Sequence, residues 1–145
     1  MPAAPVPDPA ELPDPAELLA MMPFAVALGM TVEAASPACV RGRLPWAADR
    51  CTAGGILHGG ALMSLADTTG GLCAFLNLPG GAGTATVESK TNFFRGVREG
   101  AVLAIARPLH IGRSFIVVQT DLEDDRGTRV GQTTQTQAVL APRAR

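Results

Sequence analysis

The segment of residues 54–67, GGILHGGALMSLAD, holds the residue types best suited to chemistry: a histidine, a glycine pair and a carboxylate. Glycines at positions 59 and 60 would leave the first turn of a helix without side chains, so that its unpaired N–H groups are open to a ligand. The helix dipole adds partial positive charge there, which suits a carbonyl oxygen or a developing oxyanion. We therefore expect Gly59 and Gly60 to bind such a group. His58, at the cap, would orient the loop or donate to the ligand.

Asp67 stands in an otherwise apolar run, where burying an unpaired carboxylate is costly. It therefore needs a partner, solvent or a function. It follows Gly59 by eight residues, which is about 12 Å along a helix axis, too far for one small reacting group to touch both. Two copies of the helix, antiparallel across a two-fold axis, would bring Gly59 of one chain to Asp67 of the other. The spacing predicts a site shared by two subunits, if both residues serve one reaction.

Simpler interpretations of the same residues stay open at this point. A histidine before a glycine pair is often only a helix cap or a loop hydrogen-bonding group. The glycine pair can serve close packing alone. Asp67 is harder to explain without a function, because the residues around it are apolar.

The remaining sequence predicts the elements that position these residues. Residues 58–76 are apolar around most of a helical circumference, which is typical of a buried helix, and Gly70 and Gly71 within it suggest close packing against another backbone. A short helix broken at Pro23 and a hairpin around Ser36 precede it. Strand-like runs rich in Val, Ile, Thr and Phe follow it at residues 84–94, 101–110, 114–123 and 128–141. This order predicts an α+β fold with an antiparallel sheet.

Composition excludes several classes of function. Hydrophobic residues make up 47% of the 145 residues, enough for a core, and the net charge of −1 argues against nucleic-acid binding. Three cysteines without a C-x-x-C pattern and two histidines make a metal site improbable and favour the cytoplasm. The longest apolar tract, residues 56–66, is too short to cross a membrane. Residues 1–15 are proline-rich and predict a disordered tail rather than a signal peptide.

Three stretches together resemble one family: GGILHGGALMSLADTTGG, TVESKTNFFRGVREG and PLHIGRSFIVVQTDLEDDRGTRVGQTTQTQ. They are similar to the hotdog-fold acyl-CoA thioesterases, in particular the PaaI-like (phenylacetate-pathway) type that includes 4-hydroxybenzoyl-CoA thioesterases. The resemblance covers residues 24–141. It implies a single hotdog domain over residues 16–145, in which an antiparallel sheet wraps a long central helix. It also implies a homodimer, usually paired into a homotetramer, that hydrolyses an acyl-CoA without a cofactor other than the CoA of the substrate.

The resemblance also assigns roles. Gly59 would supply the backbone N–H that polarises the thioester carbonyl, with His58 beside it in support. Asp67 of the partner subunit would attack the carbonyl or activate water, and Thr86 would position that water. Thr52 stands where the family usually has Asn or Gln to hold the thioester or water. Its shorter side chain would act only through a shifted loop or a water molecule.

Arginines in or beside the late turns are candidates for the phosphates of CoA. Arg95, Arg98 and Arg113 lie where a phosphate could be reached, although each can equally be an ordinary solvated turn residue. The HIGRS segment matches a part that contacts the CoA arm in relatives, so that Arg113 and Ser114 are both expected to bind it.

Two other functions remain as alternatives. A hotdog enoyl-CoA hydratase would use a histidine and an acid in one site, in a spacing not found in this sequence. An acyl-CoA-binding hotdog protein without catalysis is made plausible by Thr52.

Overall fold

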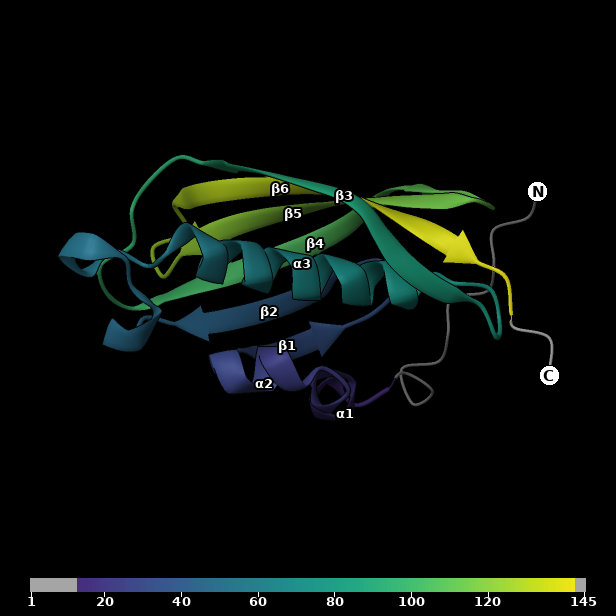
Figure 1. Cartoon of the computed structure of the whole chain (residues 1–145), viewed down its shortest axis with the longest axis horizontal. Coiled ribbons are helices and arrows are strands. Elements are labelled where there is room, and N and C mark those ends of the chain that lie inside the picture. Colours follow the sequence, from purple (N-terminus) through teal and green to yellow (C-terminus); the bar gives the residue numbers. More distant parts are fainter. Residues whose placement is uncertain (1–12, 143–145) are drawn as a thin grey trace.

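One long helix, α3 (Gly59–Phe75), lies along a six-stranded antiparallel sheet in the computed structural model, which describes residues 13–142 (Figure 1). The strand order is β1-β2-β4-β5-β6-β3. The strands are β1 (Thr31–Ala35), β2 (Val40–Pro45), β3 (Gly83–Phe93), β4 (Ala101–Ile111), β5 (Phe115–Asp124) and β6 (Arg129–Leu140). The structure confirms the expected α+β architecture, with a sheet wrapped around a central helix.

Two short helices, α1 (Pro15–Ala20) and α2 (Pro23–Leu28), precede the sheet. Proline is favoured at a first helical position, so Pro23 begins the second helix where the first one ends. Gly29 ends α2 in a left-handed conformation with φ of 83°. The expected break at Pro23 is confirmed.

The expected tail boundary is wrong at its last residues. Asp14 caps α1 because its Oδ1 accepts from the N–H of Ala16 at 2.9 Å, and Pro15 is the first residue of that helix. A proline and an acid at a helix start follow the ordinary rules for N-termini, so these two residues belong to the helix rather than to the tail. Residues 1–12 lie outside the described residues.

The helix α3 is not buried on all sides of the single chain, contrary to the expectation from its composition. Its inner face packs between the sheet and the N-terminal helices and includes Leu62, Leu65 and Cys73. Met63 and Phe75 on the other side are 43% and 41% exposed, and Asp67 shares their face because it is spaced from them by multiples of four residues. A stripe of the helix therefore stays open along its length.

The two helix glycines differ in their surroundings, and within residues 13–142 the nearest atoms to a Cβ at either position do not include backbone. A Cβ added to Gly70 would collide with the side-chain oxygen of Gln135, so that glycine makes room for a side chain. A Cβ added to Gly71 would meet nothing within 4 Å. Gly71 instead borders an open cavity beside Asp67.

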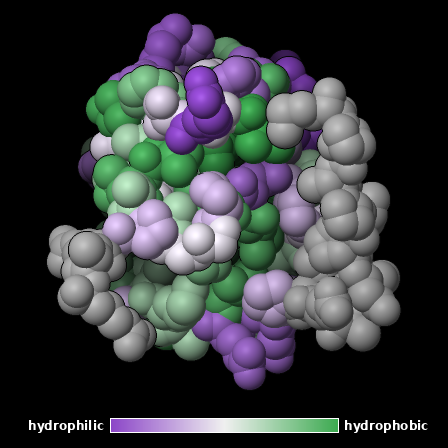
Figure 2. Space-filling view, turned by 90° about the vertical axis from the view of Figure 1, so that its right-hand side faces the viewer, coloured by the Kyte–Doolittle hydropathy of each residue, from purple (hydrophilic) through white to green (hydrophobic). Residues whose placement is uncertain are grey.

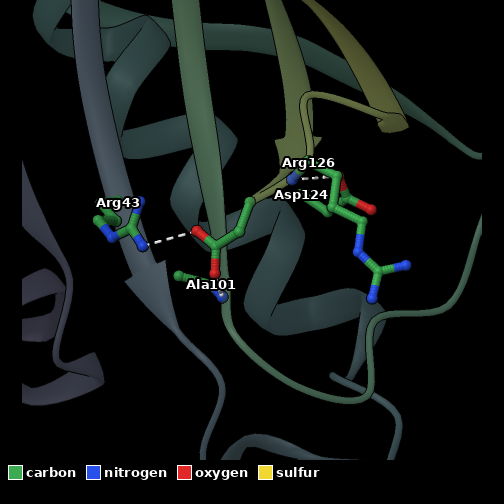
Figure 3. A network of polar contacts seen from close by, with 5 residues as sticks. Arg43, Ala101, Asp124 and Arg126 are labelled. Atoms are coloured by element: carbon green, nitrogen blue, oxygen red, sulfur yellow. Dashed lines mark hydrogen bonds and ion pairs between the residues drawn. The ribbon is translucent and has the colours of Figure 1, made fainter.

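A polar network fixes the turn between β5 and β6 to the rest of the sheet (Figure 3). Asp125 accepts from Arg43 of β2 at 2.7 Å and from the N–H of Ala101 of β4 at 2.9 Å. The neighbouring Asp124 accepts from backbone N–H groups of Arg126 and Thr128, and the bond from Thr128 is the largest cause of its lowered pKa. The network holds together the end of the sheet at which α3 begins.

Candidate active site

The first turn of α3 presents one open backbone donor. His58 is the N-cap, and its Nδ1 accepts from the N–H of Gly60 at 2.8 Å. The N–H groups of Ala61 and Leu62 donate to the carbonyl of His58. Among the described residues, the N–H of Gly59 has no partner. Gly59 is therefore free to donate to a ligand as expected, whereas the N–H of Gly60 is already used by the cap.

His58 does not line the cavity at Gly59. It lines a neighbouring cavity together with Asp49 and Arg50. Because its Nδ1 accepts a hydrogen bond, the proton of the neutral ring is on Nε2. Of the two roles considered for His58, the geometry supports orientation of the helix start.

The open N–H of Gly59 borders a cavity that contains two other expected residues. Thr52 and Arg95 line it, as does the ring of Phe93. A Cβ added to Gly59 would lie 3.2 Å from Cζ of Phe93, so the ring covers the glycine closely. The structure thus brings Gly59, Thr52 and Arg95 together at the start of the helix.

Asp67 borders a second cavity, between α2, α3, β3 and β6, that also contains Thr86. Most of the surrounding side chains are apolar, among them Phe24, Leu72 and Phe75. Asp67 and Thr86 are therefore together, as expected. Gly59 does not line this cavity, so one chain holds two separate half-sites.

Two glutamines of β6 support the second half-site and were not predicted. Gln135 donates from Nε2 to Oδ1 of Asp67 at 3.4 Å, and Gln137 donates from Nε2 to Oγ1 of Thr86 at 2.8 Å. Thr84 in turn donates to Oε1 of Gln137 at 3.1 Å. Because Thr86 accepts from Gln137, its own hydroxyl proton is available to a ligand or to water. The signal in the sequence is the QTTQTQ run, in which Gln135 and Gln137 are buried and Gln132 lies on the other face of β6.

Burial raises the pKa of the Asp67 carboxyl, and the hydrogen bond from Gln135 opposes that effect. Among residues 13–142, no other ionisable side chain lines the cavity around it. A carboxylate with a raised pKa is a stronger base than an ordinary aspartate, which suits it to take a proton from water.

Replacement of Asp67 by asparagine should stabilise the fold at neutral pH. The raised pKa means that ionisation of the Asp67 carboxyl is less favourable in the folded state than in the unfolded state. This group therefore favours folding only while it is protonated. Its contribution is complete below the ordinary pKa of 3.8 and is lost as pH rises through the folded pKa. We expect the free energy of unfolding of Asp67→Asn, from urea titrations, to exceed that of the wild type at pH 7 and to approach it as pH falls. A variant less stable than the wild type at pH 7 would contradict the raised pKa.

The four residues expected to bind CoA lie at opposite ends of one chain. Arg95 borders the Gly59 cavity, and Arg98 donates from Nη1 to the carbonyl of Gly54 at 2.5 Å at the same end. Arg113 and Ser114 are in the turn between β4 and β5, at the end where α3 finishes. A single chain therefore does not bring the two pairs together.

The end that carries Arg113 has a mixed surface (Figure 2). Hydrophilic side chains stand there beside broad apolar areas. Four large hydrophobic residues at the ends of β4, β5 and β6 are about half exposed: Leu109, Ile111, Phe115 and Leu140.

Residues 13–142 lack two features. No three or more side chains of His, Cys, Asp or Glu gather there as a set that could hold a metal ion. Nor does that part of the chain contain a helix with the length and apolar character needed to span a membrane.

Comparison with known proteins identifies sequence relatives of the chain. A sequence model described as the thioesterase superfamily matches residues 54–131. The 1,4-dihydroxy-2-naphthoyl-CoA hydrolase of Escherichia coli is 32% identical over 110 residues, which are 76% of this chain and 75% of that protein. The proofreading thioesterase EntH of Cronobacter sakazakii is 31% identical over 86 residues, 59% of this chain and 63% of that protein.

Solved structures show the same architecture. A thioesterase of Haemophilus influenzae superposes with a TM-score of 0.84 at 26% identity, covering 90% of this chain and 92% of the other. A mutant thioesterase of Pseudomonas aeruginosa also gives a TM-score of 0.84, at 29% identity, with 90% and 96% covered. The fold of these structures is the hotdog fold expected from the sequence.

Proposed function

The chain belongs to the thioesterase superfamily and is a thioester hydrolase, and we propose that its active site is built by two subunits acting on an acyl-CoA. The observation that carries this proposal is the separation of Gly59 from Asp67. They border different cavities and are about 12 Å apart along α3. One donor and one carboxylate can meet at a single thioester only if they come from two chains.

The edge strand β3 offers the surface for such an assembly. Among the described strands it pairs only with β6, which leaves its other edge unpaired over a strand of 11 residues. A long edge strand of this kind presents unpaired N–H and C=O groups that can pair with another chain. Both half-sites border this strand: Thr86 lies beside Asp67, and Phe93 lies over Gly59. Antiparallel pairing of two β3 strands about a two-fold axis would therefore bring the Asp67 end of one chain to the Gly59 end of the other.

Charge complementarity favours a register for this pairing. Glu88 and Lys90 are both exposed and flank Ser89 on one face of the strand. A two-fold axis at Ser89 places Glu88 of each subunit opposite Lys90 of the partner subunit, which is a favourable cross-strand pair. The same axis places Thr84 and Ala85 opposite the Phe94 and Phe93 end of the partner strand.

The chemical step follows from the two half-sites. The N–H of Gly59 donates to the thioester carbonyl oxygen and stabilises the oxyanion as it forms. Asp67 of the partner subunit takes a proton from water while the water oxygen bonds to the carbonyl carbon. Collapse of the tetrahedral intermediate breaks the C–S bond and releases the acid and the CoA thiolate, which is then protonated. We favour this route over direct attack by Asp67, because the Thr86 hydroxyl in the same cavity can hold a water there.

The surroundings of Asp67 indicate the type of acyl group. Apolar side chains of α2 and α3, including Phe24, Leu72 and Phe75, form most of the cavity wall. None of its lining residues in the described part of the chain is cationic. We propose an apolar aryl or medium-chain acyl group. The name of the Escherichia coli relative, which specifies an aromatic acyl group, agrees with this proposal.

The CoA arm would then lie across the two chains. The dimer would bring Arg113 and Ser114 of one subunit near the end of the partner that holds Arg95 and Arg98. Arginine is suited to phosphate because its guanidinium forms paired hydrogen bonds. No cofactor besides the CoA of the substrate enters this scheme. The exposed apolar residues around Arg113 further support pairing of two dimers into a homotetramer.

A panel of aryl-CoA and acyl-CoA thioesters tests the function. Release of free thiol, followed with a thiol-reactive dye, is the expected result. An acyl-CoA-binding protein would bind CoA in calorimetry without releasing thiol. A hydratase would consume an enoyl-CoA, seen as loss of absorbance of its conjugated double bond, without thiol release. Either of the last two results would contradict the proposal.

A further inference from the structure

Gln135 lies wholly buried beneath α3, and the reaction described above gives it no role. Its carboxamide nitrogen donates to Oδ1 of Asp67. Its carboxamide oxygen is buried without a hydrogen-bond partner among the described residues. A buried amide with one unpaired end is destabilising relative to an apolar side chain of the same shape. Packing alone therefore does not explain why a glutamine stands at this position.

The helix and the sheet both make room for this carboxamide. A side chain at Gly70 would collide with the Gln135 oxygen, and a glycine inside a helix costs about 1 kcal/mol relative to alanine. Oγ1 of Thr120 lies 3.1 Å from the position that a Gly70 Cβ would take, and it is also buried without a partner among the described residues. Gly70 on α3, Thr120 on β5 and Gln135 on β6 thus each lower the stability of the fold around one amide.

We propose that Gln135 is a positioning residue that holds one carboxylate oxygen of Asp67 against the sheet and so directs the other oxygen toward the cavity lined by Thr86. The inference rests on the proposed role of Asp67 in thioester hydrolysis. Gln135 comes from β6 and contacts Asp67 through Oδ1, and it is not among the residues that line the substrate cavity. Gln135 therefore acts on the reaction through Asp67 and does not touch the substrate.

The electrostatic setting of Asp67 makes this contact measurable. The cavity walls supplied by α2, α3, β3 and β6 hold no ionisable side chain other than Asp67. The hydrogen bond from the amide of Gln135 lowers the pKa of Asp67 against the effect of burial. Loss of the amide should leave burial unopposed and raise that pKa further.

The variant Gln135→Met tests the proposal, because methionine has a similar shape and no amide. We expect the titration midpoint of the Asp67 carboxyl, followed by carbon-13 NMR, to rise by about one pH unit. The pH midpoint of the acid limb of the kcat/KM profile should rise by a similar amount. The matched control is Thr133→Val, which removes another buried polar group of β6 that contacts Thr91 rather than Asp67. The control should leave both values unchanged.

A second variant keeps the test decisive if Gln135→Met does not fold. Gly70→Ala keeps the glutamine at position 135, but the added Cβ displaces its carboxamide. Alanine also favours the helix more than glycine does. It should move the Asp67 midpoint in the same direction. An unchanged or lowered midpoint in the folded variants would overturn the positioning role. A wild-type protein that hydrolyses no thioester would overturn the proposed function instead, while the NMR titration would still decide whether Gln135 holds Asp67.

Discussion

Asp67→Asn should reduce kcat for thioester hydrolysis by roughly three orders of magnitude, the size of effect seen when a positioned general base is lost. Asparagine keeps the shape of the side chain and can still contact Gln135, but it cannot take a proton from water. Binding of the CoA arm relies on other residues, so KM should change little. Thiol release under saturating acyl-CoA measures the effect, and the urea titration of the same variant checks that it is folded.

A second carboxylate serves as the control for this substitution. Glu123 is half-buried on β5 and lines neither half-site cavity. Glu123→Gln should retain the wild-type kcat. If Asp67→Asn kept more than about a tenth of the wild-type rate, a catalytic role for Asp67 would be untenable.

Gly59→Pro should lower kcat by roughly a hundredfold to a thousandfold, because it removes the N–H that faces the thioester oxygen. The helix start tolerates a proline at this position. Gly59 is the first residue of α3, where a missing N–H breaks no helical bond, and His58 has φ of −61° and ψ of 136°, a conformation compatible with a following proline. The substitution therefore removes the donor while it preserves the backbone.

Gly59→Ala separates the loss of the donor from added bulk. Its Cβ would lie 3.2 Å from the Phe93 ring, which is 49% exposed and can move aside. Alanine keeps the N–H, so we expect kcat to fall by at most about tenfold, which is less than the fall expected when the donor is removed. Steady-state kinetics of both variants give the comparison. Equal losses in the two variants would show that bulk at Gly59 matters and the N–H does not.

The elements of the fold were predictable because their hydrophobic patterns are strong. The expected helix at residues 58–76 agrees with Gly59–Phe75 within one residue at each end. The long strands also agree within one residue at each end, because turn-like segments such as RGVREG separate them. The prediction that α3 is buried all round was wrong, because its open stripe of Met63, Asp67 and Phe75 is as apolar as its core face except at Asp67.

The candidate site was predictable in part. Glycine at a helix start and an acid in an apolar helix are unusual enough to single out Gly59 and Asp67. The supporting glutamines were not found, because β6 is polar on both faces over residues 132–137. Without alternation between polar and apolar residues, the sequence does not tell which glutamines face the helix. Only the pairing register of the sheet places Gln135 beneath Asp67.

The shared site is the central claim, and mixed dimers of two inactive variants test it most directly. Gly59→Pro and Asp67→Asn chains, each with a different affinity tag, are produced together and the mixed dimer is purified through both tags. In that dimer one site carries both lesions and the other combines an intact Gly59 with an intact Asp67 of the partner subunit. We expect about half of the wild-type kcat per dimer. A mixed dimer no more active than its two parent variants would contradict a site built by two subunits.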